Sequence, residues 1–478
     1  MKQVVFVAAE VHPFAQTGGL AEVIGSLPQA IKETSRDYQV SVVMPYYRVV
    51  QKKIRDQVKL IATAEVMLAW RRLYCGFLHL NEGGIDYYFI DNQYYYDRDE
   101  LYGHYDDGER FAFFGKAVFH LLDAIHLTPD ILHTHDWHSA MVNVYLDILY
   151  KKEGHLLNTK SIFTIHNIQY QGIFPPEILE DVLGISSQYR HIMEYNGLVN
   201  FMKGAITTAD LVTTVSPRYA KEIRTAQFAC GLEYITRLHP EKIEGILNGI
   251  NTVFYDPNHD PILSSLYTPK TFHQKAINKE YLQKSLGLVQ DTTIPMIAII
   301  SRLVTQKGLN LVVDVFRDMM ELPCQIIILG KGDDYYQEKF VELAKEYPGR
   351  VASIIAFDIN LSKKIYAGSD IFLMPSKMEP CGLSQMIACR YGTVPIVRAT
   401  GGLFDSIKDV SDTEEKGNGF VFKDFDAGQM LEKVKEAIAL YQEPPQFKKL
   451  AKHIMSVDFS WNVSAKRYIE KYNQLLNH

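Results

Sequence analysis

The sequence predicts an α/β protein made of two Rossmann-like, doubly wound domains. Short apolar runs alternate with segments of helical periodicity, which is typical of parallel sheets covered by helices. A design of strand, glycine-bearing loop and helix occurs twice, beginning at Val4 and again at Pro295. The length of 478 residues also suits two large domains. Two halves of this design suggest a ligand held in a cleft between two domains.

The composition limits the classes of function. The chain is 47% hydrophobic, which is enough to build two full cores. A net charge of -6 argues against a nucleic-acid partner, which would need a basic face. No apolar run reaches the length of a membrane span, and the N-terminal run meets Glu10 too early for a signal peptide. Five cysteines without a CxxC pair fit a reducing compartment, so we expect a cytoplasmic protein.

The first half is expected to begin with a strand at residues 4–9, followed by an amphipathic helix. Leu20, Val23, Leu27 and Ile31 recur at helical spacing and fall on one face. Short apolar runs predict further buried strands at residues 40–44, 86–90, 131–133, 161–164 and 211–215.

The second half repeats this order. A strand is expected at residues 295–300, and the helix after it has Leu309, Val312, Val313 and Phe316 on one face. Further strands are expected at residues 325–329, 371–374 and 394–397.

The best candidate for a domain boundary lies at residues 248–258, which are rich in glycine, asparagine and proline. We therefore predict an N-terminal domain at 1–250 and a C-terminal domain at 251–460. Residues 461–478 form an amphipathic helix that either closes the second domain or crosses back to the first.

The first glycine loop is Gln16-Thr17-Gly18-Gly19-Leu20. Most Gly-Gly pairs are only turns, because glycine tolerates positive φ. Here the pair stands between a strand and the start of a helix, where backbone N–H groups bind anions well. We therefore keep two interpretations, a simple turn and a phosphate site.

Arg302 and Lys307 flank the second loop, and Gly308 opens the helix after it. Such cations are often only solvated surface groups. Their place at the carboxyl end of an apolar strand, where α/β proteins bind ligands, favours a binding role. A guanidinium and an ammonium can hold a diphosphate without a metal. Both side chains are expected to be exposed.

Glu379 follows the expected strand at 371–374, near the start of a helix. A carboxylate there often only complements the helix dipole. It can also accept hydrogen bonds from both hydroxyls of a ribose. Gly401 and Gly402 form another Gly-Gly turn after a strand, and we expect them to add N–H donors to the same sheet edge.

Residues 133–138 contain three histidines and an aspartate, which is a plausible set of zinc ligands. No further ligand cluster is near in sequence, so we favour sugar binding, with Asp136 accepting from hydroxyls and Trp137 stacking on a ring. His166 ends another apolar strand. It is either a buried, satisfied histidine or, as its place at the same sheet edge favours, a ligand contact.

Asp97-Arg98-Asp99 is the DxD pattern of metal-dependent sugar-nucleotide transferases. It lies in an aromatic loop and does not follow a buried strand. We interpret it as a chance match, and we expect no metal and no other cofactor.

Together these segments resemble the bacterial glycogen (starch) synthases, a family of retaining GT-B glycosyltransferases. The resemblance runs nearly end to end and is carried by PFAQTGGLAEVIGSLP, FIDNQYYYDRDELYG, PDILHTHDWHSAM, FTIHNIQYQG, TTVSPRYAKEI, GILNGIN, SRLVTQKGL, PSKMEPCGLSQMIACRYGTVPIVRATGGL and FSW. It implies the GT-B fold, two Rossmann-like domains facing across a cleft with the last helix crossing back to the first. It also implies ADP-glucose as donor and the non-reducing end of an α-1,4-glucan such as glycogen as acceptor.

The resemblance also implies roles for particular residues. Arg302 and Lys307 would bind the donor diphosphate, Glu379 would support the donor and the transition state, and His166 would contact glucose near its C6 hydroxyl. These four form the predicted catalytic set. The predicted donor site adds Gln16, Gly18, Gly19, Gly401, Gly402 and Phe357, an aromatic against the base. The predicted sugar and acceptor site consists of Asp136, Trp137, His166 and Asn248.

The sequence departs from the family pattern at three places, and at Ile387 it differs from sister families, although synthases of this branch do not rely on an acid there. Gln16 replaces the usual lysine, Glu22 replaces an aspartate, and Asn251 ends a turn that usually has aspartate there. Ile387 stands where sister families carry a second glutamate. Gln16 turns a charge-assisted contact into a neutral one, a loss of about 1 kcal/mol or somewhat more. This affects donor affinity more than reaction type.

No nucleophilic carboxylate is evident in the donor motifs, so retention favours front-face substitution through an oxocarbenium-like state. Two alternatives remain open. A glucan phosphorylase shares the architecture but would need a pyridoxal-phosphate lysine, which no motif announces. A weakly active or non-catalytic glucan-binding paralogue is suggested by Gln16. The residues alone also leave ADP-glucose and UDP-glucose both open as donors.

Overall fold

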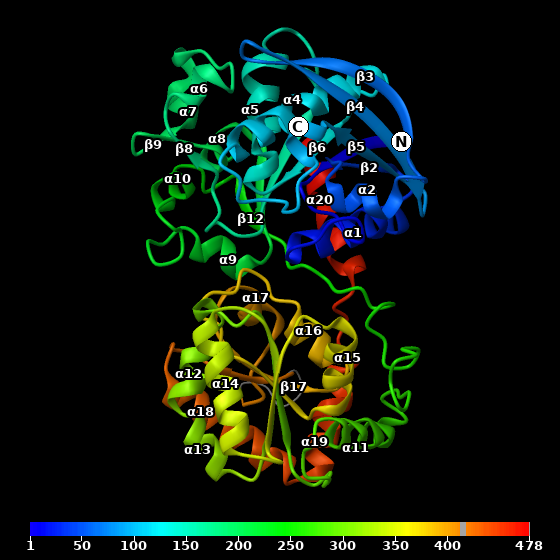
Figure 1. The fold of residues 1–478 in the computed structure, drawn as a ribbon, viewed down its shortest axis with the longest axis vertical. Helices are drawn as coiled ribbons and strands as arrows, with labels where there is room; N and C mark the ends of the chain where they lie inside the picture. The colour runs from blue at the N-terminus through cyan, green and yellow to red at the C-terminus, as the bar shows by residue number, and fades with distance from the viewer. Residues whose placement is uncertain (412–416, 478) are drawn as a thin grey trace. The chain divides into compact units, whose positions relative to one another are not determined.

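The computed structural model describes residues 1–411 and 417–477. These residues form two compact units, shown in Figure 1. Unit 1 combines Met1–Asn248 with the C-terminal segment from Trp461, and unit 2 is Gly249–Ser460. In the described part of the chain, no helix is long and apolar enough to cross a membrane.

Unit 1 is built on a nine-stranded sheet, in which the strands from β12 to β5 run parallel and β4 and β3 add an antiparallel edge. Its order is β12 (Ile243–Gly245), β11 (Leu211–Thr214), β7 (Lys160–Ile165), β6 (Ile131–His135), β1 (Lys2–Val7), β2 (Tyr38–Pro45), β5 (Ile85–Asp91), β4 (Arg71–Glu82) and β3 (Lys59–Leu68). A small antiparallel sheet joins β8 (Ile173–Phe174), β10 (Leu198–Asn200) and β9 (Glu194–Tyr195).

Unit 2 has a six-stranded, fully parallel sheet. Its order is β15 (Val351–Ile355), β14 (Gln325–Gly330), β13 (Met296–Ile300), β16 (Ile371–Met374), β17 (Val394–Arg398) and β18 (Phe420–Phe422). All the strands expected from apolar runs are present in the two sheets. They are buried almost throughout, because helices cover both faces of parallel sheets.

Helices connect the strands of each unit. Unit 1 contains α1 (Gly19–Thr34), α2 (Arg48–Ile54), α3 (Gln93–Tyr96), α4 (Asp107–Ala124), η1 (Trp137–Ser139), α5 (Ala140–Tyr145), η2 (Leu146–Tyr150), α6 (Ile178–Asp181), η3 (Ser187–Tyr189), α7 (Arg190–Met193), α8 (Phe201–Thr208), α9 (Pro217–Glu222), α10 (Glu233–Leu238) and α20 (Trp461–Leu476). Unit 2 contains η4 (Phe272–Gln274), α11 (Lys275–Ser285), η5 (Thr305–Lys307), α12 (Leu309–Asp314), α13 (Phe316–Glu321), α14 (Asp334–Glu346), α15 (Ile359–Gly368), α16 (Ser384–Arg390), α17 (Gly401–Ser406), α18 (Ala427–Tyr441) and α19 (Pro444–Ile454).

The two predicted amphipathic helices are present, with one difference. The four residues predicted for the buried face of α1 are all buried. The helix expected from Leu309 to Phe316 is divided at Val315 into α12 and α13, and Val313 is only partly buried. Helical periodicity does not reveal such a break, because the apolar spacing continues across it.

The C-terminal helix α20 packs in unit 1, beside α1 (Figure 1). Its Tyr468 and Tyr472 are fully buried, and Ser464 donates a hydrogen bond of 2.6 Å to the carbonyl of Leu247. Within unit 2, the N–H of Ile250 donates to the carbonyl of Phe459 at 2.8 Å. The two chain segments that leave unit 2 therefore run side by side at its boundary.

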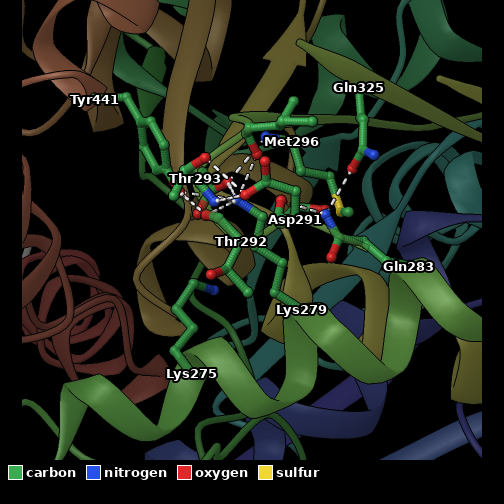
Figure 2. Close-up of polar contacts among 12 residues, drawn as sticks. Lys275, Lys279, Gln283, Asp291, Thr292, Thr293, Met296, Gln325 and Tyr441 are labelled. Atoms are coloured by element: carbon green, nitrogen blue, oxygen red, sulfur yellow. Dashed lines mark hydrogen bonds and ion pairs between the residues drawn. The ribbon is translucent and has the colours of Figure 1, made fainter. Parts of the chain in front are cut away.

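Buried lysines fasten α11 to the core of unit 2. Figure 2 shows Lys279 pointing from α11 toward Thr292 and Tyr441. Its Nζ donates to two backbone carbonyls, to the Tyr441 hydroxyl at 2.8 Å and to the Asp370 carboxylate at 2.6 Å. Lys275 donates in the same way to three carbonyls and to the hydroxyl of Thr393. The carboxylate of Asp370 compensates the charge of Lys279 in the interior. Burial lowers the pKa of Lys275 to about 7.

Candidate functional site

The candidate residues divide between the two units, and each group is described within its own unit. Arg302 and Lys307 follow the carboxyl end of β13, in the turn that leads to α12. Gly308 closes this turn with a φ of 72°, and a Cβ there would stand 1.9 Å from the carbonyl oxygen of Pro375. Conformation and space both require glycine at this place. The Arg302 side chain is exposed, and it makes no hydrogen bond or ion pair within residues 1–411 and 417–477.

Lys307 has a different environment from Arg302. Its Nζ lies 2.7 Å from Oε2 of Glu379, and the side chains of the two residues are only 16% and 8% exposed. The expectation that Lys307 is exposed is therefore wrong, because it folds back onto the carboxylate. Ser376 donates a second hydrogen bond to the same oxygen at 2.9 Å. The other oxygen, Oε1, accepts none from any described residue, so it remains available for a ligand hydroxyl.

Arg398 shapes the loop that carries Glu379, and sequence reasoning missed it. This buried residue ends β17, and its guanidinium donates to the carbonyls of Ser376, at 2.8 Å, and Lys377. An arginine that ends an otherwise apolar strand was the available signal. Its contacts hold the backbone just before Glu379 in place.

Gly401 and Gly402 allow α17 to approach the Glu379 loop closely. Gly401 has a φ of 43°, and a Cβ there would stand 1.8 Å from the carbonyl oxygen of Glu379. The N–H of Gly402 donates to the carbonyls of Glu379 and Pro380. This N–H, which we expected to face a ligand, is therefore engaged within the protein in this structure. Phe357 follows β15 at the same sheet edge and is 82% exposed.

In unit 1, the glycine loop is organised by Glu10, a second residue that sequence reasoning missed. The carboxylate is buried, and it accepts hydrogen bonds from the N–H and hydroxyl of Thr17 at 2.5 and 2.6 Å. It also accepts from the N–H of Gly18 at 3.1 Å and from the hydroxyl of Tyr102 at 2.9 Å. Two of the N–H groups expected to bind an anion thus already hold the carboxylate of Glu10.

The rest of the loop is open. A Cβ on Gly18 or Gly19 would meet no atom within 4 Å, so neither glycine is required by neighbouring protein atoms. Close approach of a ligand would explain why both residues are glycine. Gln16 is exposed, and its amide donates to Glu22 at 3.1 Å while its oxygen lies 3.2 Å from Nδ1 of His12. The two departures from the family pattern at 16 and 22 therefore contact each other.

Asp136 and His166 come together at the carboxyl edge of β6 and β7. Oδ1 of Asp136 accepts from the N–H of His166 at 2.8 Å and, more weakly, from the N–H of Asn167 at 3.4 Å. Burial raises the pKa of Asp136 to about 7 although these N–H groups oppose the shift, and burial lowers the pKa of His166 to about 3. The imidazole of His166 is therefore neutral at physiological pH, and it can bind a sugar hydroxyl without carrying charge.

The other histidines of the run 133–138 are internal. His133 is fully buried between the hydroxyls of Tyr472, at 2.8 Å, and Thr164, at 2.7 Å. Nδ1 of His135 lies 3.0 Å from Nε2 of His166. In the described part of the chain, no three His, Cys, Asp or Glu side chains are grouped so that they could hold a metal ion.

Trp137 and Asn248 are both largely buried in unit 1. Trp137 is 9% exposed, and its ring packs against Phe111, Phe174 and Phe201. In this conformation its ring is packed among aromatic side chains of unit 1, and stacking on a sugar stays a prediction. The Oδ1 atom of Asn248 is buried without a hydrogen-bond partner in the described residues, which suits a group that meets a ligand.

The two aspartates of the DxD pattern form ion pairs with an arginine. The guanidinium of Arg48 contacts Asp97 at 2.7 Å and Asp99 at 2.6 Å. These carboxylates are therefore joined to an arginine on α2, and they do not converge on a common empty position.

Two α/β units with wholly or largely parallel sheets are the architecture of GT-B glycosyltransferases, and comparison with known proteins agrees. Residues 3–238 match the family described as starch synthase catalytic domain, and residues 285–454 match glycosyl transferases group 1. The chain is 44% identical to the glycogen synthases of Geobacillus thermodenitrificans and Bacillus cereus, covering 99% of this chain and 98% and 99% of theirs. The chain belongs to the glycogen (starch) synthase family.

Solved structures show the same relationship. The catalytic domain of starch synthase IV from Arabidopsis thaliana, bound to ADP and acarbose, superposes with a TM-score of 0.91 at 34% identity, covering 100% of both chains. Sucrose-phosphate synthase from Thermosynechococcus elongatus, at 17% identity and a TM-score of 0.62 over 100% of both chains, shares the fold. These relatives are described as synthases, and none as a non-catalytic glucan-binding protein.

Proposed function

We propose that this chain transfers glucose from ADP-glucose to the non-reducing end of an α-1,4-glucan, with retention of configuration. The observation that carries this proposal is the arrangement in unit 2. Arg302, which is exposed and has no partner among the described residues, stands in the same short turn as Lys307, which pairs with Glu379, at the carboxyl edge of a parallel sheet. This edge is where open α/β sheets bind nucleotides.

In the proposed reaction, the bond between the anomeric carbon and the donor phosphate breaks, and ADP leaves with the bonding electrons. Arg302 stabilises the negative charge that develops on the diphosphate, and Lys307 shares its charge between this group and Glu379. The acceptor hydroxyl attacks from the face that the diphosphate leaves. Its proton passes to the departing phosphate oxygen, so configuration is retained without a covalent enzyme intermediate.

Glu379 is suited to a different part of the same step. Its Oε2 is fixed by Lys307 and Ser376, whereas Oε1, which has no partner in residues 1–411 and 417–477, can accept a hydroxyl of the donor. A carboxylate near the sugar also stabilises positive charge in an oxocarbenium-like transition state. Phe357, which is 82% exposed, is proposed to stack on the nucleotide base.

The unit 1 residues are proposed to bind the sugars. His166 is neutral and partly exposed, so it suits a hydrogen bond to a glucose hydroxyl. Asp136, whose pKa is about 7, and the buried amide of Asn248 add polar groups for sugar or acceptor. The open space at Gly18 and Gly19 fits a close approach of the donor.

The choice of ADP over UDP and the independence from metal belong to this proposal. The starch synthase IV relative was solved with ADP, which supports an adenine nucleotide. Arg48 already pairs with Asp97 and Asp99, which supports cationic side chains in place of a divalent ion. The cytoplasmic location stays a prediction.

A turnover assay tests the function. The purified chain should elongate glycogen with ADP-glucose and release ADP, and it should use UDP-glucose much more slowly. Glycogen binding without transfer would favour the non-catalytic alternative. Release of glucose 1-phosphate from glycogen and phosphate, with the absorbance of bound pyridoxal phosphate, would favour a phosphorylase.

A further inference from the structure

His135 and His166 share one hydrogen bond between ring nitrogens. Nδ1 of His135 lies 3.0 Å from Nε2 of His166, and the ring centroids are 5.3 Å apart. Burial lowers the pKa of His166 to about 3 and that of His135 well below its usual value, so both rings are neutral. A neutral imidazole has a proton on only one of its two ring nitrogens. In this contact, one ring must therefore donate and the other must accept.

The surroundings of His135 decide which ring donates. Its second nitrogen, Nε2, is buried and has no hydrogen-bond partner in the described part of the chain. If Nδ1 accepted from His166, Nε2 would carry a buried proton without an acceptor. Orphaned N–H groups are rarer in folded proteins than unpaired acceptors. The favoured arrangement therefore has the proton of His135 on Nδ1, donated to His166.

This arrangement fixes the tautomer of His166. Because its Nε2 accepts, its only proton is on Nδ1. That nitrogen has no partner within residues 1–411 and 417–477, and the residue is partly exposed. The backbone of His166 is held as well, since its N–H donates to Asp136 at 2.8 Å. The ring is thus fixed in orientation and in proton position before any ligand arrives.

We propose that His135 is a positioning residue, which holds His166 in the tautomer whose Nδ1–H donates to the C6 hydroxyl of the transferred glucose. This inference rests on the proposed function and extends it to a residue that has no contact with substrate. A histidine whose second nitrogen is fixed by a buried partner is the usual device for setting which nitrogen meets a ligand.

The test compares two donors, ADP-glucose and its 6-deoxyglucose analogue, in wild type and in His135→Phe. Phenylalanine keeps a flat ring against Phe6, which stacks on His135 at 5.4 Å, but it cannot donate to His166. The ratio of kcat/KM for the two donors should fall roughly five- to tenfold in the variant, the value of one hydrogen bond to an uncharged group. Equal losses on both donors would show a merely structural role and overturn the inference.

His133→Phe is the matched control. It removes another buried histidine from the same strand, but one that bonds Tyr472 and Thr164 and not His166. Its stability should fall while the ratio between donors stays at the wild-type value. A ratio that falls equally in both variants would count against His135.

A second measurement is independent of the variants. In wild-type protein labelled with ¹⁵N-histidine, the His166 signals, identified by their loss in His166→Gln, should report a protonated Nδ1 and a bare Nε2. The opposite tautomer would overturn the inference. If the wild type transfers no glucose from ADP-glucose at all, the proposed function fails first, and the ¹⁵N result still decides the tautomer.

Discussion

Nζ of Lys307 lies 2.7 Å from Oε2 of Glu379, although 72 positions separate the two residues in sequence. Both side chains are mostly buried, so most of the charge of Lys307 is compensated within the protein. Arg302, exposed and unpaired in the described residues, is then the main uncompensated cation of this turn. Although Arg302 and Lys307 are close together in the sequence, they should respond differently to mutation.

Arg302→Ala should lower kcat about 100-fold or more, because one oriented donor to developing charge is typically worth that much. The melting temperature should stay unchanged, since the side chain has no partner to lose among the residues that the structure describes. Arg317→Ala, which removes another exposed arginine of unit 2, is the control and should keep full activity. A folded Arg302→Ala enzyme with near-normal kcat would contradict the proposed mechanism.

Lys307→Met should lower both activity and stability. Removing one partner of a largely buried pair leaves an uncompensated carboxylate and costs about 2 to 3 kcal/mol, below the value for fully buried pairs because Lys307 keeps some solvent contact. The matching fall in melting temperature is about 5 °C or more for a domain of this size. Calorimetry on Lys307→Met, Glu379→Gln and the double variant should show that the double variant recovers stability but not activity. Simple additivity of the two losses would argue against a coupled pair.

Chelators should leave the rate of transfer unchanged. Arg48 bridges Asp97 and Asp99, so Asp97→Asn and Asp99→Asn should affect stability at most slightly and activity little. The measurement is glucose transfer in EDTA, with and without added Mg²⁺ or Mn²⁺. Loss of activity that either ion restores would make the two aspartates metal ligands after all.

Gln16→Lys should lower KM for ADP-glucose roughly fivefold or more at low salt, if the new ammonium reaches the diphosphate. Glu22 competes for it, because its carboxylate already accepts from Gln16 at 3.1 Å. The gain should therefore be larger in Gln16→Lys/Glu22→Gln than in the single variant, and it should shrink with added salt. An unchanged KM in both variants would mean that residue 16 does not reach the phosphates.

Asp136→Asn should stabilise the protein more at about pH 8 than at about pH 5. Burial raises the pKa of Asp136 from 3.8 to about 7, so between these values the folded state holds a proton that the unfolded state has released. Stability from this group is therefore greatest at low pH and is lost as pH rises through about 7. Asparagine has no such dependence and still accepts the N–H of His166. A melting temperature whose mutational gain does not grow with pH would contradict the raised pKa.

The strands and the sheet edge could be predicted from sequence because they depend on local pattern. Apolar runs located both sheets, and the carboxyl ends of their strands placed Arg302, Glu379, Asp136 and His166 at edges where ligands bind. The sequence could not show which side chains contact each other in the folded protein. The pairing of Lys307 with Glu379 depends on two loops meeting after the sheet forms.

Other misses have related causes. Glu10 stands only a few residues before the glycine loop, but its carboxylate turns back onto the N–H groups of Thr17 and Gly18 only because the chain bends between them. The hairpin of β3 and β4 escaped notice because apolar residues such as Leu60, Ile61 and Met67 are exposed in it, so its sequence lacks a clear alternation of apolar and polar residues. Arg398 acts through backbone carbonyls, which have no signature in sequence.

The placement of α20 in unit 1 has a consequence for how the chain is made. Unit 2 is contiguous, so its sequence is complete once residue 460 has been added. Unit 1 is interrupted, and its buried Tyr468 and Tyr472 follow the whole of unit 2 in the chain. Domains generally fold as units as they emerge. The half that is translated first is therefore completed after the second one, and a released chain truncated before Trp461 should contain a finished second unit and an unfinished first one.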